Sequence, residues 1–503
     1  MWNEILLSLC SWQTLFVMTA GVVVGMIGGA LPGISSSMSV SLLLPFTFSM
    51  SPSMGILLLM SIYTASVYGG SVSAILINTP GTGSSAATAI DGYTLTQKGM
   101  GASALRISTF ASGVGGIVSA IALFLLTPPL SKISLLFGPS EYFLLACLGL
   151  SAVATLAASS IIKGVLAGVL GLFLATIGTD YSFGIPRFTF GILNLESGIS
   201  FVPALIGLFA LSEVLKMAEH KKTADVIPAT FESDRIFPSR SELKGLCGTL
   251  ARGSIIGMII GILPGAGAEI GSWISYNTEK RLSKQRDEMG NGSLVGVAAS
   301  EVANNAVTGA ALIPLFTMGI PGSSVSAIIL GGLLIHGMVP GRELFTEYAT
   351  VTYTAILGFL MANIIMMFMG LVLVKPFSQV TKLPKKILAP MIVALCFVGA
   401  FSINNSLFDV GIMVIFGLLG YVLQKAGFHP APIVLAMVLG PMAESRFLQT
   451  YTLSDGHVLS YMLGRPLSVT LMILVAVFLF SPFFFKNVQQ GPKKASAANE
   501  VKL

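Results

Sequence analysis

Long apolar runs separated by short polar loops make up most of the chain. Residues 103–129, 350–374 and 466–485 each reach or exceed the roughly 20 apolar residues with which an α-helix crosses the hydrocarbon core of a bilayer. Further apolar segments lie near residues 141–158, 161–178, 200–215, 387–402, 407–424 and 431–445. The pattern predicts an all-α polytopic membrane protein with about 10–14 membrane segments.

The composition supports a membrane location, because 54% of the 503 residues are hydrophobic and 10% are charged. Soluble globular domains are about one quarter charged. The net charge of +6 does not indicate a nucleic-acid partner, since no Lys or Arg precedes Lys98 and most later ones fall in short polar loops. This distribution is typical of cytoplasmic loops under the positive-inside rule. The four cysteines are scattered and predict neither a disulfide framework nor a metal motif.

An internal duplication divides the chain into two halves. Residues 25–33 (GMIGGALPG) and 257–265 (GMIIGILPG) are identical at seven of nine positions, at an offset of 232 residues. A second Pro-Gly pair follows each motif, at Pro80-Gly81 and at Pro321-Gly322. The predicted organisation is a first transmembrane repeat (1–215), a cytoplasmic linker (216–245), a second transmembrane repeat (246–485) and a disordered cytoplasmic tail (486–503).

The second of the duplicated motifs predicts a re-entrant helical hairpin with Pro264-Gly265 at its tip. The polar stretches on either side both carry basic residues and are expected in the cytoplasm, yet a single apolar segment, 251–277, separates them. Its two arms, of about 13 and 11 residues, are too short to cross a core of about 30 Å. The duplicate, 16–48, predicts a second hairpin with its tip at Pro32-Gly33. Because it is expected to enter from outside, the halves are predicted to be inverted repeats, a plan common in secondary transporters.

Two further helices are expected to break at Pro80-Gly81 and Pro321-Gly322. Irregular backbone at membrane depth is tolerated where protein buries it or a water-filled cavity reaches it. Amide groups at the start of a half-helix bind carboxylates, and carbonyls at its end bind cations such as Na⁺. Alternatively, the breaks merely kink tightly packed helices. The candidate substrate-binding residues are Pro32, Gly33, Ser35, Ser36, Asn78, Pro80, Gly81, Thr82, Ser84, Pro264, Gly265, Gly267, Asn304, Asn305, Pro321, Gly322, Ser323 and Ser324.

Ionisable residues inside the apolar segments are candidates for ion coupling, because such groups are unfavourable in a bilayer and are usually functional. Glu301, Asn304 and Asn305 have the i, i+3 and i+4 spacing that places them on one face of a helix. A carboxylate near a helix N-terminus also has a purely structural use, so both interpretations of Glu301 stay open. The candidate coupling-ion ligands are Glu269, Glu301, Asn304, Thr308 and Thr317.

For Asp91 two interpretations stay open: cation coordination, a proton relay or gating on the one hand, and a helix end or turn, which we favour, on the other. The histidines are expected to carry no chemistry, with His336 near a helix end and His429 in the turn before Pro430. The sequence lacks Walker, GxSxG and HExxH motifs, so neither an enzyme nor a bound cofactor is expected. Without a P-loop, an ion gradient is the natural source of energy.

Longer motifs occur in both halves. The first half contains GALPG (29–33), YGGSVSAILINTPG (68–81), AIDGY (89–93), FGPSEYF (137–143) and PRFTFG (186–191). The second half contains ARGSIIGMIIGILPGAGAEI (251–270), TEKRLSK (278–284) and GVAASEVANNAVTGAALIPLFTMGIPGSSVSAIILGG (296–332). With these motifs the chain resembles the large, TctA-type membrane subunit of the tripartite tricarboxylate transporters over nearly its whole length except the tail.

The resemblance implies a secondary transporter subunit that imports citrate, other tricarboxylates or related organic acids by symport with Na⁺ or H⁺. It further implies a small membrane subunit, a periplasmic solute-binding protein that delivers the solute, and a multi-pass location in a bacterial inner membrane. Two departures from the family pattern leave the substrate open: Ile-Ser-Ser-Ser (34–37) follows the first LPG, and Thr94 follows Asp-Gly-Tyr. The alternatives are a membrane-embedded enzyme, which needs a catalytic cluster, and a passive anion channel.

Overall fold

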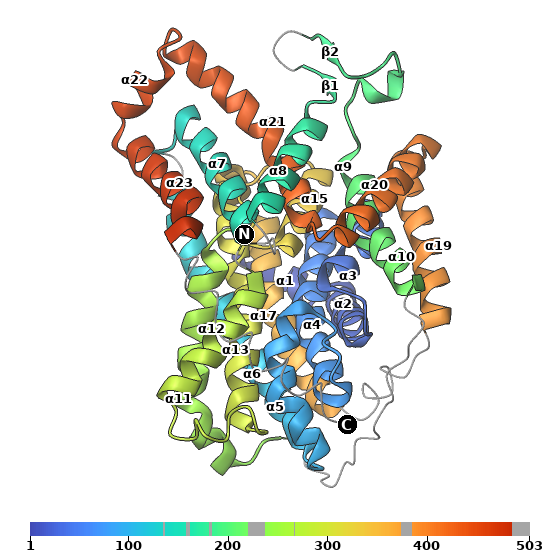
Figure 1. The fold of residues 1–503 in the computed structure, drawn as a ribbon, viewed down its shortest axis with the longest axis vertical. Coiled ribbons are helices and arrows are strands. Elements are labelled where there is room, and N and C mark those ends of the chain that lie inside the picture. The colour runs from blue at the N-terminus through green and yellow to red at the C-terminus, as the bar shows by residue number, and fades with distance from the viewer. Residues whose placement is uncertain are drawn as a thin grey trace, which may run out of the picture.

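The structure is a computed structural model of the chain, and it describes residues 1–133, 136–156, 161–180, 184–219, 237–265, 267–373 and 385–484. Within these ranges helices dominate, and the strands β1 (Gly178–Thr179) and β2 (Pro186–Arg187) form one short antiparallel pair (Figure 1). Nine helices of the described part are long and apolar enough to cross a membrane. The predicted fold class, an all-α polytopic membrane protein, is therefore confirmed.

The helices follow the apolar segments of the sequence. The first half contains α1 (Trp2–Cys10), α2 (Trp12–Ala30), α3 (Ser36–Leu43), η1 (Pro45–Ser49), α4 (Pro52–Ile77), η2 (Gly83–Ser85), α5 (Ala86–Gln97), α6 (Gly101–Ile133), α7 (Pro139–Leu156), α8 (Ile161–Ala175), η4 (Leu193–Leu195), α9 (Phe201–Leu205), η5 (Ile206–Leu211) and α10 (Ser212–Glu219). The second half contains α11 (Arg240–Ile262), α12 (Gly267–Leu282), α13 (Leu294–Ala310), α14 (Leu312–Met318), α15 (Ser324–Ile335), α16 (Arg342–Thr346), α17 (Ala349–Val372), α19 (Lys385–Asn404), α20 (Leu407–Lys425), α21 (Pro430–Leu453), α22 (Val458–Leu463) and α23 (Pro466–Phe484).

The predicted linker and tail fall largely outside the described residues. Of the linker, residues 220–236 are not described, while α10 ends at Glu219 and α11 begins at Arg240. The polar stretch 216–245 therefore begins and ends within helices. The predicted tail, 486–503, lies outside the described residues altogether.

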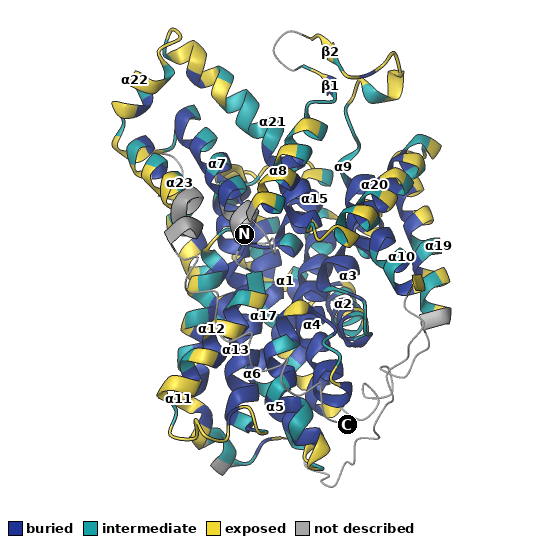
Figure 2. Cartoon of the chain, in the orientation of Figure 1, coloured by how far each residue is buried: buried dark blue, intermediate teal, exposed yellow. Residues whose placement is uncertain are grey.

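Helix α4 forms the centre of the molecule, because every one of its residues from Gly55 to Ile77 is buried. Figure 2 shows this helix inside the dark blue core. A helix buried on all sides needs neighbours around its whole circumference. Helix α4 has them from both halves, since it packs against α2, α5 and α6 and also against α13, α15 and α17. The two halves therefore share one core, and α4 is placed to carry residues toward a common site.

Glycines allow α2 and α4 to approach closely. A Cβ added at Gly25 would lie 2.6 Å from the carbonyl oxygen of Ile62, and one added at Gly29 would lie 2.0 Å from that of Ser66. Real Cβ atoms do not approach this closely, so the backbones are in contact at these positions. Small residues at helix interfaces serve this purpose in membrane proteins.

We expect Gly29→Ala to destabilise the protein by about 1–3 kcal/mol, because the added methyl group forces α2 away from α4. The measurement is thermal unfolding in detergent, followed by size-exclusion chromatography of the heated samples. The control is Gly168→Ala in α8, where an added Cβ meets nothing within 4 Å. That variant should be slightly more stable than the wild type, because alanine has a higher helix propensity than glycine. Equal stability of the two variants would contradict the close-packing argument.

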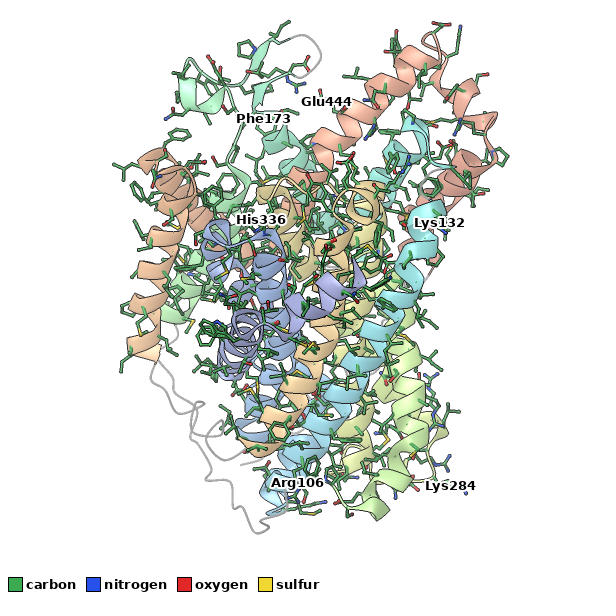
Figure 3. All side chains as sticks on the ribbon, turned by 180° about the vertical axis from the view of Figure 1, so that it is seen from behind. Arg106, Lys132, Phe173, Lys284, His336 and Glu444 are labelled. Atoms are coloured by element: carbon green, nitrogen blue, oxygen red, sulfur yellow. The ribbon has the colours of Figure 1, made fainter. Side chains whose placement is uncertain are left out.

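Labelled residues mark the two ends of the molecule. Figure 3 shows Arg106 and Lys284 at one end, and Phe173 and Glu444 at the other. Lys284 belongs to the basic loop between α12 and α13, which the positive-inside rule predicts to be cytoplasmic. The β1–β2 hairpin lies at the opposite end (Figure 1). The end that bears the α12–α13 loop is therefore predicted to face the cytoplasm.

A helix breaks at each of the four Pro-Gly pairs. The breaks lie between α2 and α3, between α4 and η2, between α11 and α12, and between α14 and α15. Gly33 and Gly265 have φ of 96° and 78°, a left-handed conformation that favours glycine. Asn78 and Gly319 also have positive φ and end α4 and α14 in the same way. Helices α2 and α3 contact each other, as do α11 and α12. That each pair forms a re-entrant hairpin stays a prediction.

The halves contain matching contacts around their second break. The Gly81 amide donates to the carbonyl of Gly70 (3.1 Å), and a Cβ added at Gly81 would lie 2.0 Å from the carbonyl oxygen of Gly29. In the second half the Gly322 amide donates to Ala311 (3.3 Å), and its added Cβ would lie 2.6 Å from the carbonyl oxygen of Gly261. In both halves, then, the broken helix packs on the predicted hairpin. The inverted relation of the halves and the re-entry of the hairpins stay predictions.

Candidate functional site

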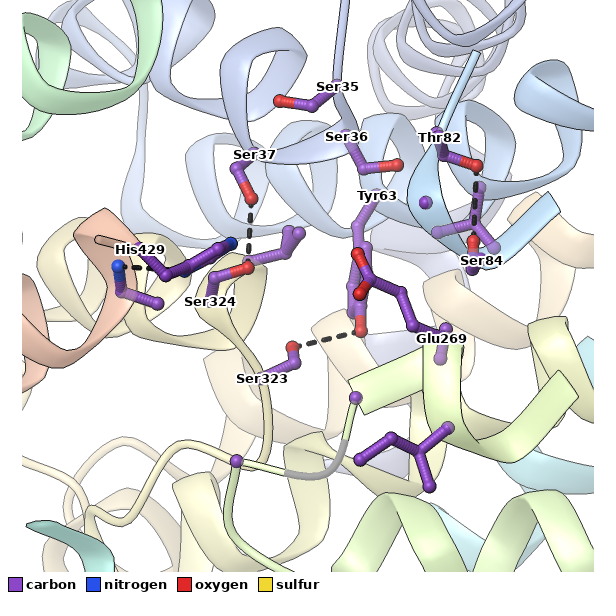
Figure 4. A pocket seen from close by; sticks show the side chains of 18 of the residues that line it. Ser35, Ser36, Ser37, Tyr63, Thr82, Ser84, Glu269, Ser323, Ser324 and His429 are labelled. Carbon is purple, nitrogen blue, oxygen red and sulfur yellow. Dashed lines mark hydrogen bonds between the residues drawn. The ribbon is translucent and has the colours of Figure 1, made fainter. Parts of the chain in front are cut away.

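The helix breaks converge on a pocket at the centre of the molecule (Figure 4). It is a cavity of ≈ 140 Å³ whose lining comes from all four breaks and from α4 and the start of α21. Its polar and glycine lining residues are Ser35, Ser36, Ser37, Tyr63, Thr82, Gly83, Ser84, Gly265, Gly267, Glu269, Ser323, Ser324 and His429. The lining is therefore rich in small hydroxyl groups and contains one carboxylate.

Three helices begin at this pocket. Ser35 is the N-cap of α3 and its hydroxyl accepts from the amide of Met38 (3.1 Å). Ser323 is the N-cap of α15 in a reciprocal capping box with Ser326. Helix α12 begins at Gly267, which lines the pocket. The first turn of a helix carries amide groups without intrahelical partners and a partial positive charge, so these three ends together favour an anion.

Hydroxyl groups connect the two halves across the pocket. Ser37 and Ser324 lie within hydrogen-bond distance (3.0 Å), and so do Tyr63 and Ser323 (3.1 Å), as Figure 4 shows. The hydroxyl of Ser36 is buried and has no hydrogen-bond partner among the described residues. That hydroxyl is therefore available to a bound solute.

The carboxylate of Glu269 projects into the pocket from the first turn of α12 (Figure 4). A Cβ added at Gly83 would lie 2.2 Å from its Oε1 atom, so the absence of a side chain at residue 83 makes room for the carboxylate. The neighbouring Ser272 hydroxyl donates to the carbonyl of Ser84 (2.8 Å) and holds α12 against this break. Figure 4 draws no hydrogen bond from Glu269 to the other pocket side chains. The pocket thus combines an anion-attracting set of helix ends with a carboxylate of its own.

Glu301 lies outside the pocket in a cluster of hydroxyl groups. It is fully buried in α13. Its Oε1 atom accepts from Ser71 of α4 (2.5 Å) and from Thr88 of α5, and its Oε2 atom accepts from Ser108 (3.2 Å) and Ser112 (2.7 Å) of α6. Four donors from three helices therefore satisfy this carboxylate without a basic side chain. The same oxygens are hard ligands of the kind that small cations prefer.

The two asparagines on the same face are fully buried. Neither the Oδ1 nor the Nδ2 atom of Asn304 has a hydrogen-bond partner among the described residues, and the same holds for Oδ1 of Asn305. Asn305 Nδ2 donates weakly to the Thr64 hydroxyl (3.4 Å). The hydroxyls of Thr308 and Thr317 donate to carbonyls of their own helices. Buried amide groups without partners are unfavourable, so a water or an ion is expected at Asn304.

The structure brings twelve of the 22 candidate residues to two adjoining cavities. Ser35, Ser36, Thr82, Ser84, Gly265, Gly267, Glu269, Ser323 and Ser324 line the pocket, and Gly33, Pro80 and Gly81 line an adjoining cavity. Ten candidates line neither cavity: Pro32, Asn78, Pro264, Glu301, Asn304, Asn305, Thr308, Thr317, Pro321 and Gly322. The binding roles of all these residues stay predictions.

Tyr63 and His429 are among the pocket residues that the sequence does not predict. Tyr63 lies in the middle of α4, distant along the chain from any Pro-Gly pair. The apolar residues around it in the sequence do not indicate a binding role. His429 is in the turn before α21, as expected, but that turn faces the pocket. In the sequence, the feature that points to His429 as a pocket residue is the His429-Pro430 pair at the start of an apolar segment.

Asp91 joins the two halves of the molecule. Its Oδ1 atom accepts from the amides of Gly290 (2.8 Å), Gly292 (2.9 Å) and Ser293 (3.0 Å), and its Oδ2 atom accepts from the Tyr276 hydroxyl (2.9 Å). The side chain is fully buried within α5, so the expected helix end or turn is not where it lies. It instead holds the α12–α13 loop of the second half.

We expect Asp91→Ala to lower the free energy of unfolding by at least about 2 kcal/mol, because four donors in a buried place lose their acceptor. The control is Asp287→Ala in the same loop, where the side chain is 95% exposed. That substitution should change the free energy of unfolding by no more than about 0.5 kcal/mol. Thermal unfolding in detergent measures both. An Asp91→Ala protein as stable as the control would show that the loop does not depend on this carboxylate.

Comparison with known proteins places the chain among transporter subunits. A family described as "Tripartite tricarboxylate transporter TctA family" matches residues 15–435. The chain is 36% identical over 452 residues to "Uncharacterized 52.8 kDa protein in TAR-I ttuC' 3'region" of Agrobacterium vitis, a match that covers 90% of this chain and 89% of the relative. It is 36% identical over 216 residues to "Uncharacterized protein in TAR-II ttuC' 3'region" of the same organism, covering 43% and 89%. No solved structure matches the chain.

Proposed function

From the premise that this chain belongs to the tripartite tricarboxylate transporter TctA family, we propose that its central pocket holds a tricarboxylate or a related organic acid during ion-driven import. The chain is a multi-pass membrane subunit of such a transporter. The observation that carries the proposal is the meeting of three helix starts in one pocket lined by small hydroxyl groups. Amide groups and hydroxyls of this kind donate to carboxylate oxygens.

The carboxylate of Glu269 in the same pocket accounts for ion coupling. Two carboxylates about 4 Å apart repel each other by about 4 kcal/mol at the effective dielectric constant typical of protein sites. An anionic solute therefore binds next to Glu269 together with a proton or a cation that removes this repulsion. Movement of the solute then requires movement of Na⁺ or H⁺, which is the definition of symport.

Glu301 and Asn304 supply a second place for the coupling ion. The carboxylate of Glu301 and its four hydroxyl partners offer several hard oxygen ligands, and Asn304 has a buried amide oxygen without a partner among the described residues. Oxygen ligands of this kind suit Na⁺, and a buried carboxylate also suits a proton. We assign the ion to this cluster and to Glu269, and the solute to the pocket.

The tripartite family implies partner subunits for this chain. We propose a small membrane subunit and a periplasmic solute-binding protein that delivers the organic acid, in the inner membrane of a bacterium. The end of the molecule with the β1–β2 hairpin is then the periplasmic end, because the basic α12–α13 loop lies at the other (Figures 1 and 3).

The test is uptake of labelled citrate and succinate into proteoliposomes that contain this chain with its small membrane subunit. The solute-binding protein is added outside, and a Na⁺ or H⁺ gradient is imposed. Accumulation that needs both the gradient and the binding protein would support the proposal and identify the ion. Flux that equilibrates without a gradient would favour a passive anion channel, and chemical conversion of the solute would favour a membrane-embedded enzyme.

A further inference from the structure

A second cavity continues the central pocket toward α10 and α20. It has a volume of ≈ 520 Å³ and shares six lining residues with the pocket: Ser35, Ser37, Gly83, Glu269, Ser324 and His429. A solute that leaves the pocket through this shared wall therefore passes into the second cavity. We call this second cavity the vestibule. Its other walls come from the break at Pro80-Gly81 and from residues of η5, α10, α20 and the α20–α21 turn.

Lys216 is the one Lys or Arg among the described residues that line the pocket or the vestibule. It lies in the last turn of α10, opposite an acidic neighbour, Glu213, on the same helix. Among the described lining residues of the two cavities, the only other carboxylate is Glu269. Within this part of the chain, Lys216 is therefore the basic side chain with which an organic acid in the vestibule can pair.

The ammonium group of Lys216 has hydrogen-bond partners but retains an N–H donor for a ligand. Its Nζ atom donates to Gln424 Oε1 (2.9 Å) and to both carboxylate oxygens of Glu213 (3.2 and 3.4 Å). One N–H serves Gln424 and one is shared by the two oxygens of Glu213, so the third N–H of the ammonium group is left for a ligand. The side chain is 37% exposed, and it lines the vestibule, so a solute there can reach it.

The alternative is a purely structural role, in which Lys216 only stabilises the contact between α10 and α20. Other contacts already stabilise this interface. Lys425 of α20 forms an ion pair with Glu219 of α10 at 2.7 Å, and Gln424 Nε2 donates to the Ser212 hydroxyl (2.9 Å). Lys425 lines neither cavity, whereas Lys216 does. Lys216 and Lys425 therefore lie at the same interface in different surroundings, so a substitution of Lys425 is a matched control for the same substitution of Lys216.

We propose that Lys216 binds a carboxylate group of the solute in the vestibule, on the release side of the pocket. The side follows from the chain: α10 ends at Glu219, immediately before the polar segment predicted to be cytoplasmic. The inference rests on the proposed transport function, and it adds a binding residue that the helix breaks do not supply. Glu213 competes with the solute for the same ammonium group and weakens its hold, which favours release.

The experiment is equilibrium binding of labelled citrate to the purified complex of this chain with its small membrane subunit, without the solute-binding protein. Lys216→Gln should raise the Kd about five- to tenfold, because it removes a charge-assisted hydrogen bond at a partly exposed site. Lys425→Gln, the matched control, should leave the Kd unchanged. Glu213→Gln should lower the Kd severalfold, because it removes the competitor for Lys216.

The outcomes separate this inference from the proposed function. Citrate that binds and is transported by the wild type, with the same Kd in Lys216→Gln, would overturn the role of Lys216 alone. Absence of any citrate or succinate flux in the wild type would overturn the proposed function, and this inference with it. If Lys216→Gln does not yield a monodisperse complex, Glu213→Gln decides, since a wild-type Kd in that variant contradicts the competition.

Discussion

Glu269→Gln is expected to abolish gradient-driven accumulation of the solute, lowering the accumulated level at least about tenfold, while the pocket still binds it. Glutamine keeps the shape of the side chain beside Gly83 but removes its charge. The charge repulsion between this side chain and a carboxylate of the solute then disappears, and with it the need for a compensating ion. Binding of the solute should become independent of Na⁺ or H⁺, so the gradient no longer drives it.

Two measurements check this expectation. The first is citrate uptake into proteoliposomes with and without the gradient, and the second is citrate binding at several concentrations of the coupling ion. The control is Glu4→Gln near the N-terminus, where the side chain is 72% exposed and does not line the pocket. Wild-type accumulation by Glu269→Gln, with binding that still depends on the ion, would show that this carboxylate does not couple the two movements.

The helix breaks were readable from the sequence because their causes are local. Proline lacks an amide hydrogen and glycine adopts left-handed backbone conformations, so a Pro-Gly pair within an apolar run ends a helix wherever the rest of the chain goes. The structure has a break at each pair, and the hydroxyl residues after them, such as Ser35 and Ser323, are the N-caps that begin the next helix. The composition and the apolar runs likewise determine the membrane fold class.

The partners of each polar residue depended on tertiary packing that the sequence does not record. Nothing near Glu301 in the chain indicates Ser71 or Ser112, which come from helices about 190 to 230 residues away. The sequence places Lys216 in a polar linker, whereas in the structure it belongs to α10 and lines the vestibule. Asn78 was grouped with the binding residues because it adjoins a break, whereas it ends α4 with a left-handed cap outside both cavities. The positions of Pro-Gly pairs predict where the helices break, but they do not predict which residues next to a break line the cavity.

The hydroxyl cluster around Glu301 allows its structural and coupling roles to be separated by two substitutions. Glu301→Leu leaves the hydroxyls of Ser71, Thr88, Ser108 and Ser112 without their shared acceptor in a fully buried place. We expect it to lower the free energy of unfolding by about 3 kcal/mol or more. Glu301→Gln keeps one acceptor oxygen, and its amide group donates to hydroxyls that reverse their direction, so the loss should be about 1 kcal/mol.

Transport distinguishes the two roles because Glu301→Gln cannot carry a proton or neutralise a cation as a carboxylate does. We expect this variant to fold, to assemble with the small membrane subunit, and to accumulate citrate at least about tenfold less than the wild type under the same gradient. The control is Glu288→Gln in the α12–α13 loop, where the side chain is exposed. Thermal unfolding in detergent and uptake into proteoliposomes are measured on the same preparations. If Glu301→Gln is stable and transports like the wild type, the carboxylate serves only as a hydrogen-bond acceptor for four hydroxyl groups of three helices, and the coupling ion binds elsewhere.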